Sequence, residues 1–290
     1  MYNTGLELME LANSKKCKIY EIVIENEVEL QGLSREEIIL KMKKALEVMK
    51  SSAQEALDKE IKSVSGLIGG DAKRFEDYRK NGNTLCGDTV VKAMARALSC
   101  SEVNAAMGRI VAAPTAGSCG ILPAALITAG EKLNKTEDEI VNALFTASGI
   151  GQIIAKNATV SGAEGGCQAE CGAAAAMAAA AIVEMAGGTP EMCLNAASIA
   201  LKNIMGLVCD PIAGLVEAPC AKRNASGVVN ALISSELALA GIKSIIPFDE
   251  VVEAMYRVGK ALPEALRETA LGGIAATPTG IKLRKQVLGE

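Results

Sequence analysis

Hydrophobic positions along this chain recur mainly with the three- and four-residue spacing of helices. The sequence SREE, beginning at Ser34, is a capping box that opens an amphipathic run to about residue 60. A second capping box, TEDE, begins at Thr136, and Thr189 followed by Pro190 is typical of a further helix start. Strand-like alternation is scarce, and residues 19–30 fit either a helix or an extended segment. The pattern predicts an all-α fold.

The character of the chain changes along its length without a linker of the kind that separates domains. Residues 1–62 are rich in charge and in helix formers, which predicts a helical outer layer. Small and apolar residues dominate from 101 to about 242, which predicts the interior. We therefore expect one domain over 1–290, with the core and the candidate site within 63–290.

Glycine marks the expected loops. Residues 63–75 and 81–88 are punctuated by Gly and read as loops, and residues 89–100 read as the helix that follows them. Near the C-terminus, the segment 268–280 is expected to end a helix and become irregular.

Composition narrows the class of protein. Hydrophobic residues make up 50% of the chain but aromatic residues only 2%, which favours helices packed closely through Ala and Gly. The net charge is -4 and the Lys and Arg residues are scattered, so nucleic acid is not an expected partner. The most apolar stretches, 172–188 and 121–130, are shorter than the roughly 18 residues of a membrane span. With no secretory signal pattern at the N-terminus, we expect a cytoplasmic protein that does not enter a membrane.

Nine cysteines and no histidine restrict the possible chemistry. Without the commonest metal ligand and the commonest general base, a metal site must use thiolates, carboxylates or backbone oxygens. With this many thiols, zinc or iron–sulfur is indicated, although buried Cys residues also serve simply as core. The cysteines are Cys17, Cys86, Cys100, Cys119, Cys167, Cys171, Cys193, Cys209 and Cys220.

The first candidate segment is the loop of small residues from Pro114 to Gly120, which leads into a helix. Backbone amides at the helix start and the hydroxyls of Thr115 and Ser118 would suit a carboxylate or phosphate. The same residues also suit a tight crossing of two helices.

The second candidate segment has Gly165 and Gly166 before a helix expected to begin around Gln168. Cys167 would then lie at the positive end of that helix, where a thiolate is favoured and a metal could bind. Cys171 lies one turn further on, inside the helix, and a structural role is expected for it.

The third candidate segment holds Cys209 and Cys220, eleven positions apart, around Pro211, Gly214 and Pro219. The prolines and the glycine predict a non-helical loop that can bring the two thiols together. The spacing matches neither zinc ribbons nor bacterial ferredoxins, and a purely structural role also fits. Three thiols from two loops suggest a cluster with one iron left open.

Four motifs together resemble the alpha chain of the iron–sulfur-dependent bacterial L-serine dehydratases: RIVAAPTAGSCGILP, EGGCQAECG, CDPIAGLVEAPCAKRNA and ETALGGIAATPTG. The resemblance runs through nearly the whole chain. It implies an all-helical fold and a 4Fe–4S cluster held by Cys167, Cys209 and Cys220, with no ligand role for Cys171 or the other five cysteines. It implies no pyridoxal phosphate.

The resemblance also implies a partner. Complete enzymes of that family have an α/β portion with a Ser-Ser-His-Thr type motif, either fused or supplied as a separate beta chain. This sequence has neither that portion nor a histidine, so we expect a beta chain in a hetero-oligomer. The general base is unassigned, and the two candidates are the partner's histidine and Lys222.

The reaction implied is elimination of water from L-serine, with an open iron acting as Lewis acid on the substrate hydroxyl. Lys222 and Arg223 would offset the charge of the cluster or hold the substrate, and a solvated surface pair is an equal alternative. The rival functions are cluster-dependent L-cysteine desulfidation and a non-catalytic iron–sulfur or zinc protein. The positions assigned to the substrate are Thr115, Ala116, Gly117, Ser118, Ser65 and Gly66.

Overall fold

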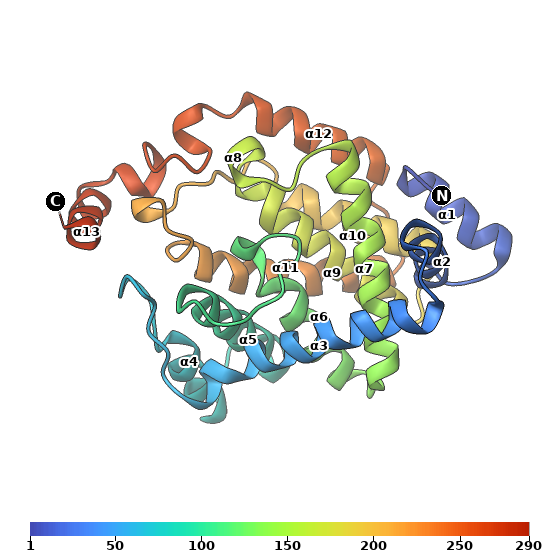
Figure 1. Cartoon of the computed structure of the whole chain (residues 1–290), viewed down its shortest axis with the longest axis horizontal. Coiled ribbons are helices and arrows are strands. Elements are labelled where there is room, and N and C mark those ends of the chain that lie inside the picture. Colours follow the sequence, from blue (N-terminus) through green and yellow to red (C-terminus); the bar gives the residue numbers. More distant parts are fainter. Residues whose placement is uncertain (290) are drawn as a thin grey trace.

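The computed structural model describes residues 1–289, which form thirteen α-helices joined by short turns and by longer loops at 106–120, 204–219 and 262–277 (Figure 1). Within this range the only β-type pairings are two isolated bridges. The prediction of an all-α fold is confirmed. The helices are α1 (Gly5–Lys15), α2 (Ile19–Gln31), α3 (Arg35–Asp58), α4 (Asp71–Lys80), α5 (Gly87–Ala105), α6 (Ile121–Lys132), α7 (Glu137–Asn157), α8 (Gly162–Gly165), α9 (Ala173–Met185), α10 (Pro190–Asn203), α11 (Cys220–Leu239), α12 (Phe248–Ala261) and α13 (Pro278–Leu288).

The centre of the molecule is α9, in which every residue from Ala173 to Met185 is buried. It packs against α6, α7, α10 and α11, and Figure 1 shows it enclosed among these helices. Eight of its thirteen residues are Ala, so neighbouring backbones can approach closely and the core contains little aromatic volume. The Ala-rich segment is therefore a buried helix, as its length predicted.

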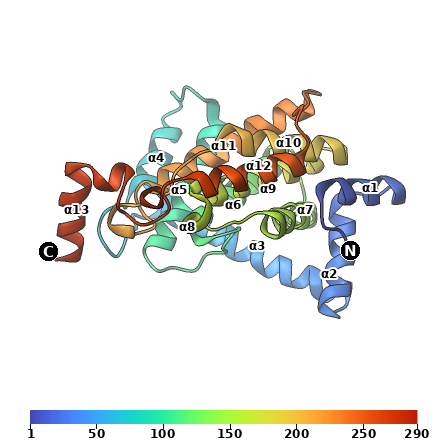
Figure 2. The same ribbon diagram turned by 90° about the horizontal axis from the view of Figure 1, so that it is seen from above.

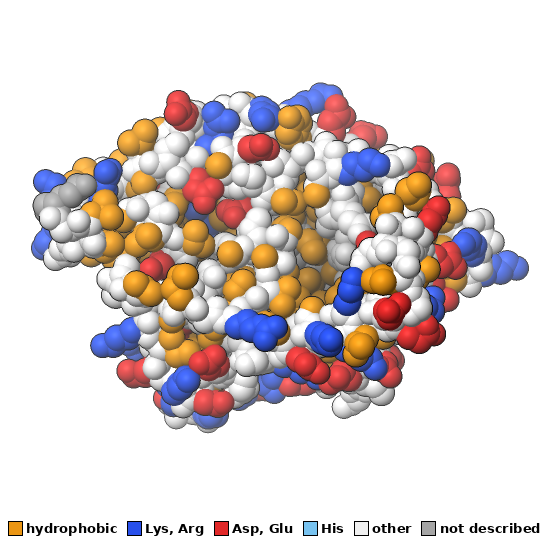
Figure 3. All heavy atoms as spheres, viewed as in Figure 1, with side chains coloured by type: hydrophobic (Ala, Val, Ile, Leu, Met, Phe, Trp, Pro, Cys, Tyr) orange, Lys and Arg blue, Asp and Glu red, His pale blue; other side chains and the backbone are white. Residues whose placement is uncertain are grey.

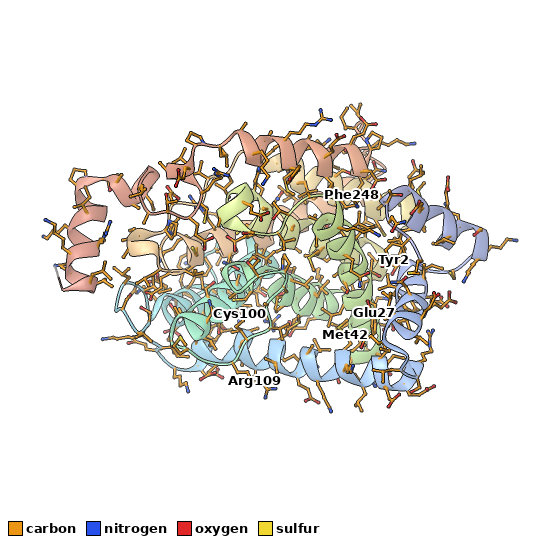
Figure 4. The ribbon with its side chains drawn as sticks, turned by 45° about the horizontal axis from the view of Figure 1, so that its top comes forward. Tyr2, Glu27, Met42, Cys100, Arg109 and Phe248 are labelled. Carbon is orange, nitrogen blue, oxygen red and sulfur yellow. The ribbon has the colours of Figure 1, made fainter. Side chains whose placement is uncertain are left out.

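The N-terminal helices α1, α2 and α3 lie along one side and one end of the body (Figure 1). The ambiguous segment 19–30 is helical, and α2 packs mainly on α7. Tyr2 reaches α7, where its hydroxyl donates to Oε1 of Gln152 at 2.9 Å. Gln152 also donates to Glu27 of α2, and Figure 4 shows Tyr2 and Glu27 close together at this end of the molecule.

Side-chain caps begin the helices where the sequence predicted them. The hydroxyls of Ser34, Thr136 and Thr189 each accept a hydrogen bond from a backbone amide in the first turn of α3, α7 and α10. Each bond satisfies one amide that has no partner inside the helix.

Two expected boundaries are wrong. Helix α4 begins at Asp71, inside the loop expected over 63–75, because Gly70 at φ 73° ends the loop there. An acidic residue at its start and basic residues at its end also suit the helix dipole. Helix α13 occupies the last residues of the segment 268–280 that was expected to be irregular. Thr277 caps it and Pro278 is its first residue, the same signal that marks α10.

Helix α13 stands at the edge of the molecule, projecting from one end in two perpendicular views (Figures 1 and 2). Its contacts are chiefly with the short turns Ile212–Gly214 and Gly273–Ala276. None of the helices described is long and apolar enough to cross a membrane. On the face shown in Figure 3, charged side chains occupy the periphery and apolar ones gather in the middle, between α3 and α12.

Candidate metal centre

Cys167 lies between the short helix α8 and a five-residue π-helical turn, Gln168–Gly172, that leads into α9. Gly166 before it has φ 77°, and a Cβ there would lie 2.8 Å from the carbonyl oxygen of Leu207. The amide of Gln168 donates to that same carbonyl at 3.0 Å. The helix therefore begins at Gln168 as predicted, and its first turn is π rather than α, a form that is frequent at functional sites.

Cys209 is fixed by a segment almost sixty residues further along the chain. Its amide donates to the carbonyl of Leu266 at 2.9 Å, and its carbonyl accepts from the amide of Glu268 at 2.7 Å. These bonds form one of the two isolated bridges, between Cys209 and Arg267. A non-local pairing thus sets where the Cys209 thiol points.

Cys220 is the first residue of α11 and follows Pro219. From Cys209 to Pro219 the chain is non-helical apart from the three-residue turn Ile212–Gly214, so the predicted loop is confirmed. The side chains of Cys167, Cys209 and Cys220 are all buried.

The three thiols are close enough to influence one another's ionisation. Burial and, next, the negative charge of Cys167 raise the pKa of Cys220 to about 12. Burial and the same charge also raise the pKa of Cys209. The pKa of Cys167 is instead lowered, first by a hydrogen bond with the Cys171 thiol and then by the charge of Arg223. Cys167 is therefore the thiol of this group that ionises most readily.

Cys171 lies beside Cys167, with 3.3 Å between the two sulfur atoms. It is fully buried, and the hydrogen bond with Cys167 together with burial raises its pKa. Cys171 thus borders the candidate centre, although it belongs to neither thiol-bearing loop. Its structural role stays a prediction.

Of the remaining five cysteines, Cys119 directly follows the Thr115–Ser118 loop, and the charge of Cys220 contributes to raising its pKa. Cys100, labelled on α5 in Figure 4, is fully buried, as are Cys119 and Cys193, and burial raises the pKa of each. Cys17 is half-buried and Cys86 is exposed. These five thiols behave as core or surface residues.

Arg223 is the cation whose charge lowers the pKa of both Cys167 and Cys220. Its guanidinium donates to Oδ1 of Asp210 at 2.8 Å and to the carbonyl of Val208 at 2.9 Å. The other oxygen of Asp210 accepts from the amide of Ile274 at 2.8 Å. Arg223 thus joins the loop after Cys209 to the C-terminal segment while its charge acts on Cys167.

Lys222 faces away from this group. Its ammonium pairs with Asp71 at the start of α4, and its side chain is 61% exposed. Of the two neighbouring basic residues, Arg223 is therefore the one positioned to offset thiolate charge.

The predicted Thr115–Ser118 loop lies against the thiol-bearing segments. It forms a short 3-10 turn, Ala116–Ser118, whose first amides have no partner inside the turn. Asn224, buried on α11, donates to the carbonyl of Gly117 at 2.7 Å and accepts from the amide of Gly120 at 2.9 Å. The same side chain donates to the carbonyl of Cys220 at 2.9 Å, which ties the loop to the cysteine.

The predicted Ser65–Gly66 wall also reaches this region. The hydroxyl of Ser65 donates to Oε2 of Glu217 at 2.6 Å, and Glu217 belongs to the loop between Cys209 and Cys220. Gly66 has φ 77° and is exposed beside it. The structure thus brings the two predicted loops and the three thiols into one region.

Glu170 is a member of this region that sequence reasoning missed. Its Oε1 accepts from the Thr115 hydroxyl at 2.7 Å, and its Oε2 lies 3.9 Å from the sulfur of Cys209. Burial raises the pKa of this carboxyl. Asp210 and Asn224 were missed as well. The available signal was their position in the sequence, since each of the three lies next to or within four residues of a predicted ligand.

Within residues 1–289, no three His, Cys, Asp or Glu side chains are arranged to hold a single metal ion. A multi-iron cluster spreads its protein ligands over different irons, so its thiols stand farther apart than those around one ion. Three buried thiols, two of which lie within the electrostatic reach of Arg223, form a donor set that fits such a cluster. Oxygen-preferring metals do not suit this set.

The fold and the site define an all-α domain whose conspicuous chemistry is a group of buried thiols. The chain belongs to the family described as serine dehydratase alpha chain, which matches residues 14–275. It is 54% identical over 290 residues to "L-serine dehydratase, alpha chain" of Peptoniphilus asaccharolyticus, covering 100% of this chain and 99% of the relative. It is 50% identical over 289 residues to "Probable L-serine dehydratase, alpha chain" of Bacillus subtilis, covering 100% and 96%. The resemblance stated from the motifs is confirmed.

One longer relative matches this chain over only part of its own length. "L-serine dehydratase" of Helicobacter pylori is 35% identical over 283 residues, which cover 95% of this chain but 62% of the relative. More than a third of that protein thus has no counterpart in this chain.

Proposed function

We propose that this chain is the alpha chain of an L-serine dehydratase, a lyase that converts L-serine to pyruvate and ammonia with a 4Fe–4S cluster held by Cys167, Cys209 and Cys220. The names of the full-length relatives support the reaction. The assignment of the cofactor is supported by one observation. Three buried thiols lie close enough beside Arg223 for the charge of one to raise the pKa of the others.

Serine loses water slowly because hydroxide is a poor leaving group and the Cα proton is weakly acidic. A 4Fe–4S cluster with three protein ligands supplies an iron without a protein ligand, a Lewis acid for the substrate hydroxyl. Removal of the Cα proton and the hydroxyl gives aminoacrylate, which tautomerises to an imine and hydrolyses to pyruvate and ammonia. Arg223 would offset the charge of the thiolates, and Asp210 would hold Arg223 in place.

The substrate carboxylate is assigned to the Thr115–Ser118 loop. The amides of Ala116 and Gly117 lie in the first turn of a 3-10 helix, where they are available to an acceptor. Asn224 would hold this loop in register with Cys220 through its bonds to both. Ser65 and Gly66, joined to the cysteine loop through Glu217, would form the second wall.

A separate beta chain is the proposed partner. The match covers only 62% of the longer relative, and two relatives that match over nearly their whole length are named alpha chains. Because the chain has no histidine, the general base is proposed to come from that partner.

Single cysteine substitutions test the cofactor assignment. After anaerobic reconstitution with iron and sulfide, we expect Cys167→Ala, Cys209→Ala and Cys220→Ala each to lose iron and serine turnover. Cys171→Ala should keep both, although its sulfur lies 3.3 Å from that of Cys167. The buried Cys193 is a matched control, since Cys193→Ala changes a core thiol away from the site. A cluster that survives any of the first three substitutions would contradict the assignment.

Substrate comparison tests the reaction. The reconstituted chain, with and without a candidate beta chain, would be assayed with L-serine, L-threonine and L-cysteine. Preference for L-cysteine would indicate desulfidation instead. A cluster whose spectrum does not respond to serine would indicate a non-catalytic protein, and full activity of the alpha chain alone would contradict the need for a partner.

A further inference from the structure

The carboxylate of Glu170 lies at the proposed site without a cation to balance it. Among residues 1–289, no Lys or Arg forms an ion pair with it. The guanidinium of Arg223, whose charge acts on Cys167, is already bonded to Asp210 and to the carbonyl of Val208. One carboxylate oxygen accepts from Thr115, and the other has only the sulfur of Cys209 at 3.9 Å. Glu170 therefore keeps acceptor capacity that the chain does not use.

Two glycines leave the space that this carboxylate occupies. A Cβ at Gly162 would lie 2.5 Å from Oε2 of Glu170, and one at Gly117 would lie 2.9 Å from its Oε1. Any larger residue at either position would displace the carboxylate. The backbone thus encloses it on two sides, between the Thr115 loop and Cys209.

L-Serine presents three polar groups, and two already have an assigned place. The hydroxyl is assigned to the iron and the carboxylate to the Thr115–Ser118 loop, which leaves the α-ammonium. An ammonium is bound best by a carboxylate, through charge-assisted hydrogen bonds. Asp210 is unsuitable because Arg223 and the amide of Ile274 occupy its oxygens. Glu170 contacts both the loop assigned to the carboxylate and Cys209, one of the proposed ligands, and so borders the places assigned to the other two groups.

We propose that Glu170 binds the α-ammonium of the amino-acid substrate and selects amino acids over hydroxy acids of the same shape. This inference rests on the proposed function, because it names the recognition of one substrate group at the same site. It makes Glu170 a substrate-binding residue and gives the Thr115 hydroxyl the role of orienting its carboxylate.

The substitution Glu170→Gln isolates the charge, since Gln keeps the shape and can still accept from Thr115. In the enzyme reconstituted with iron, sulfide and the beta chain, we expect the KM for L-serine to rise about 10- to 100-fold. Inhibition by glycerate, in which a hydroxyl replaces the ammonium, should be unchanged. Iron per chain and the visible spectrum should also be unchanged. Glu170→Asp, which keeps the charge, should recover part of the affinity for serine.

Glu164→Gln is the matched control, because Glu164 is an exposed glutamate on the neighbouring helix α8 and should behave as wild type. Equal weakening of serine and glycerate in Glu170→Gln would show that Glu170 only braces the loop, and loss of iron would assign it to cluster retention. Either result would overturn the proposed role of Glu170. The proposed function would still hold, provided that the wild-type enzyme acts on L-serine. A wild-type assembly that does not act on serine would instead remove the proposed function, and this inference with it.

Discussion

Asn224 is the single side chain whose removal should separate the substrate loop from the cysteine helix. It is 1% exposed and takes part in three hydrogen bonds, to the carbonyls of Gly117 and Cys220 and from the amide of Gly120. In Asn224→Ala the carbonyl of Cys220 keeps its partner within α11, whereas the other two groups lose theirs.

The cost follows from those two groups. A buried group left without a partner costs about 1–3 kcal/mol. Gly120 is buried and incurs the full cost, while Gly117 is half-buried and can recover some hydration. We expect Asn224→Ala to lower the free energy of unfolding by about 2–4 kcal/mol. Asn224→Asp should lower it further, because a carboxylate oxygen would face two carbonyl oxygens at 2.7 and 2.9 Å.

Urea unfolding of the metal-free chain measures this effect. Because the chain has four Tyr and no Trp, far-UV circular dichroism and tyrosine fluorescence are the two probes whose transitions should coincide. Asn83→Ala, at an exposed asparagine, should change the free energy of unfolding by less than about 0.5 kcal/mol. The reasoning would be refuted if Asn224→Ala lowered the free energy of unfolding by less than about 1 kcal/mol. It would also be refuted if Asn224→Asp lowered it less than Asn224→Ala does.

Two further predictions concern a close contact and a buried acid. Gly162→Ala should reduce iron content and activity, because its Cβ would lie 2.5 Å from Oε2 of Glu170 and 3.1 Å from the Cys209 sulfur. Gly172→Ala meets only ordinary contacts at 3.4 Å or more and should retain both; equal iron contents would contradict the steric argument. Glu184 on α9 accepts from the amides of Ile19 and Tyr20, and burial raises its pKa. Since its folded-state pKa is above the unfolded value, its contribution to stability is present at low pH and is lost as pH rises through the raised pKa. The difference in unfolding free energy between Glu184→Gln and wild type should therefore shift in favour of the variant as pH rises above 4.5, the ordinary pKa of a glutamate, and parallel pH profiles would disprove this.

Local signals in the sequence were sufficient for most helix starts. Ser34, Thr136 and Thr189 act through bonds within a single turn, so the residues involved are adjacent in sequence. Thr277-Pro278 carries the same signal and begins α13, although the Gly and Thr residues before it suggested an irregular tail.

The thiol-bearing segments could be predicted, but the groups around them could not. Cys167, Cys209 and Cys220 were selected by their flanking Gly and Pro residues and by resemblance. The contact of Glu170 with Thr115 joins residues 55 positions apart, and the bond from Asn224 to Gly117 spans 107. Such contacts depend on how α5, α9 and α11 pack, which no local pattern encodes. The π turn at Gln168–Gly172 also changes the direction of Glu170 relative to a regular α-helix.

The pairing of Cys209 with Leu266 and Glu268 has a consequence for the order of events during biosynthesis. All three proposed ligands have been synthesised once the growing chain reaches residue 220. The backbone partners of Cys209, Leu266 and Glu268, are synthesised later and leave the ribosome after the ligands. Insertion of the proposed cluster should therefore follow synthesis of the segment that contains Leu266 and Glu268. A chain ending before Leu266 would contain every ligand residue and still lack the fixed geometry to retain iron.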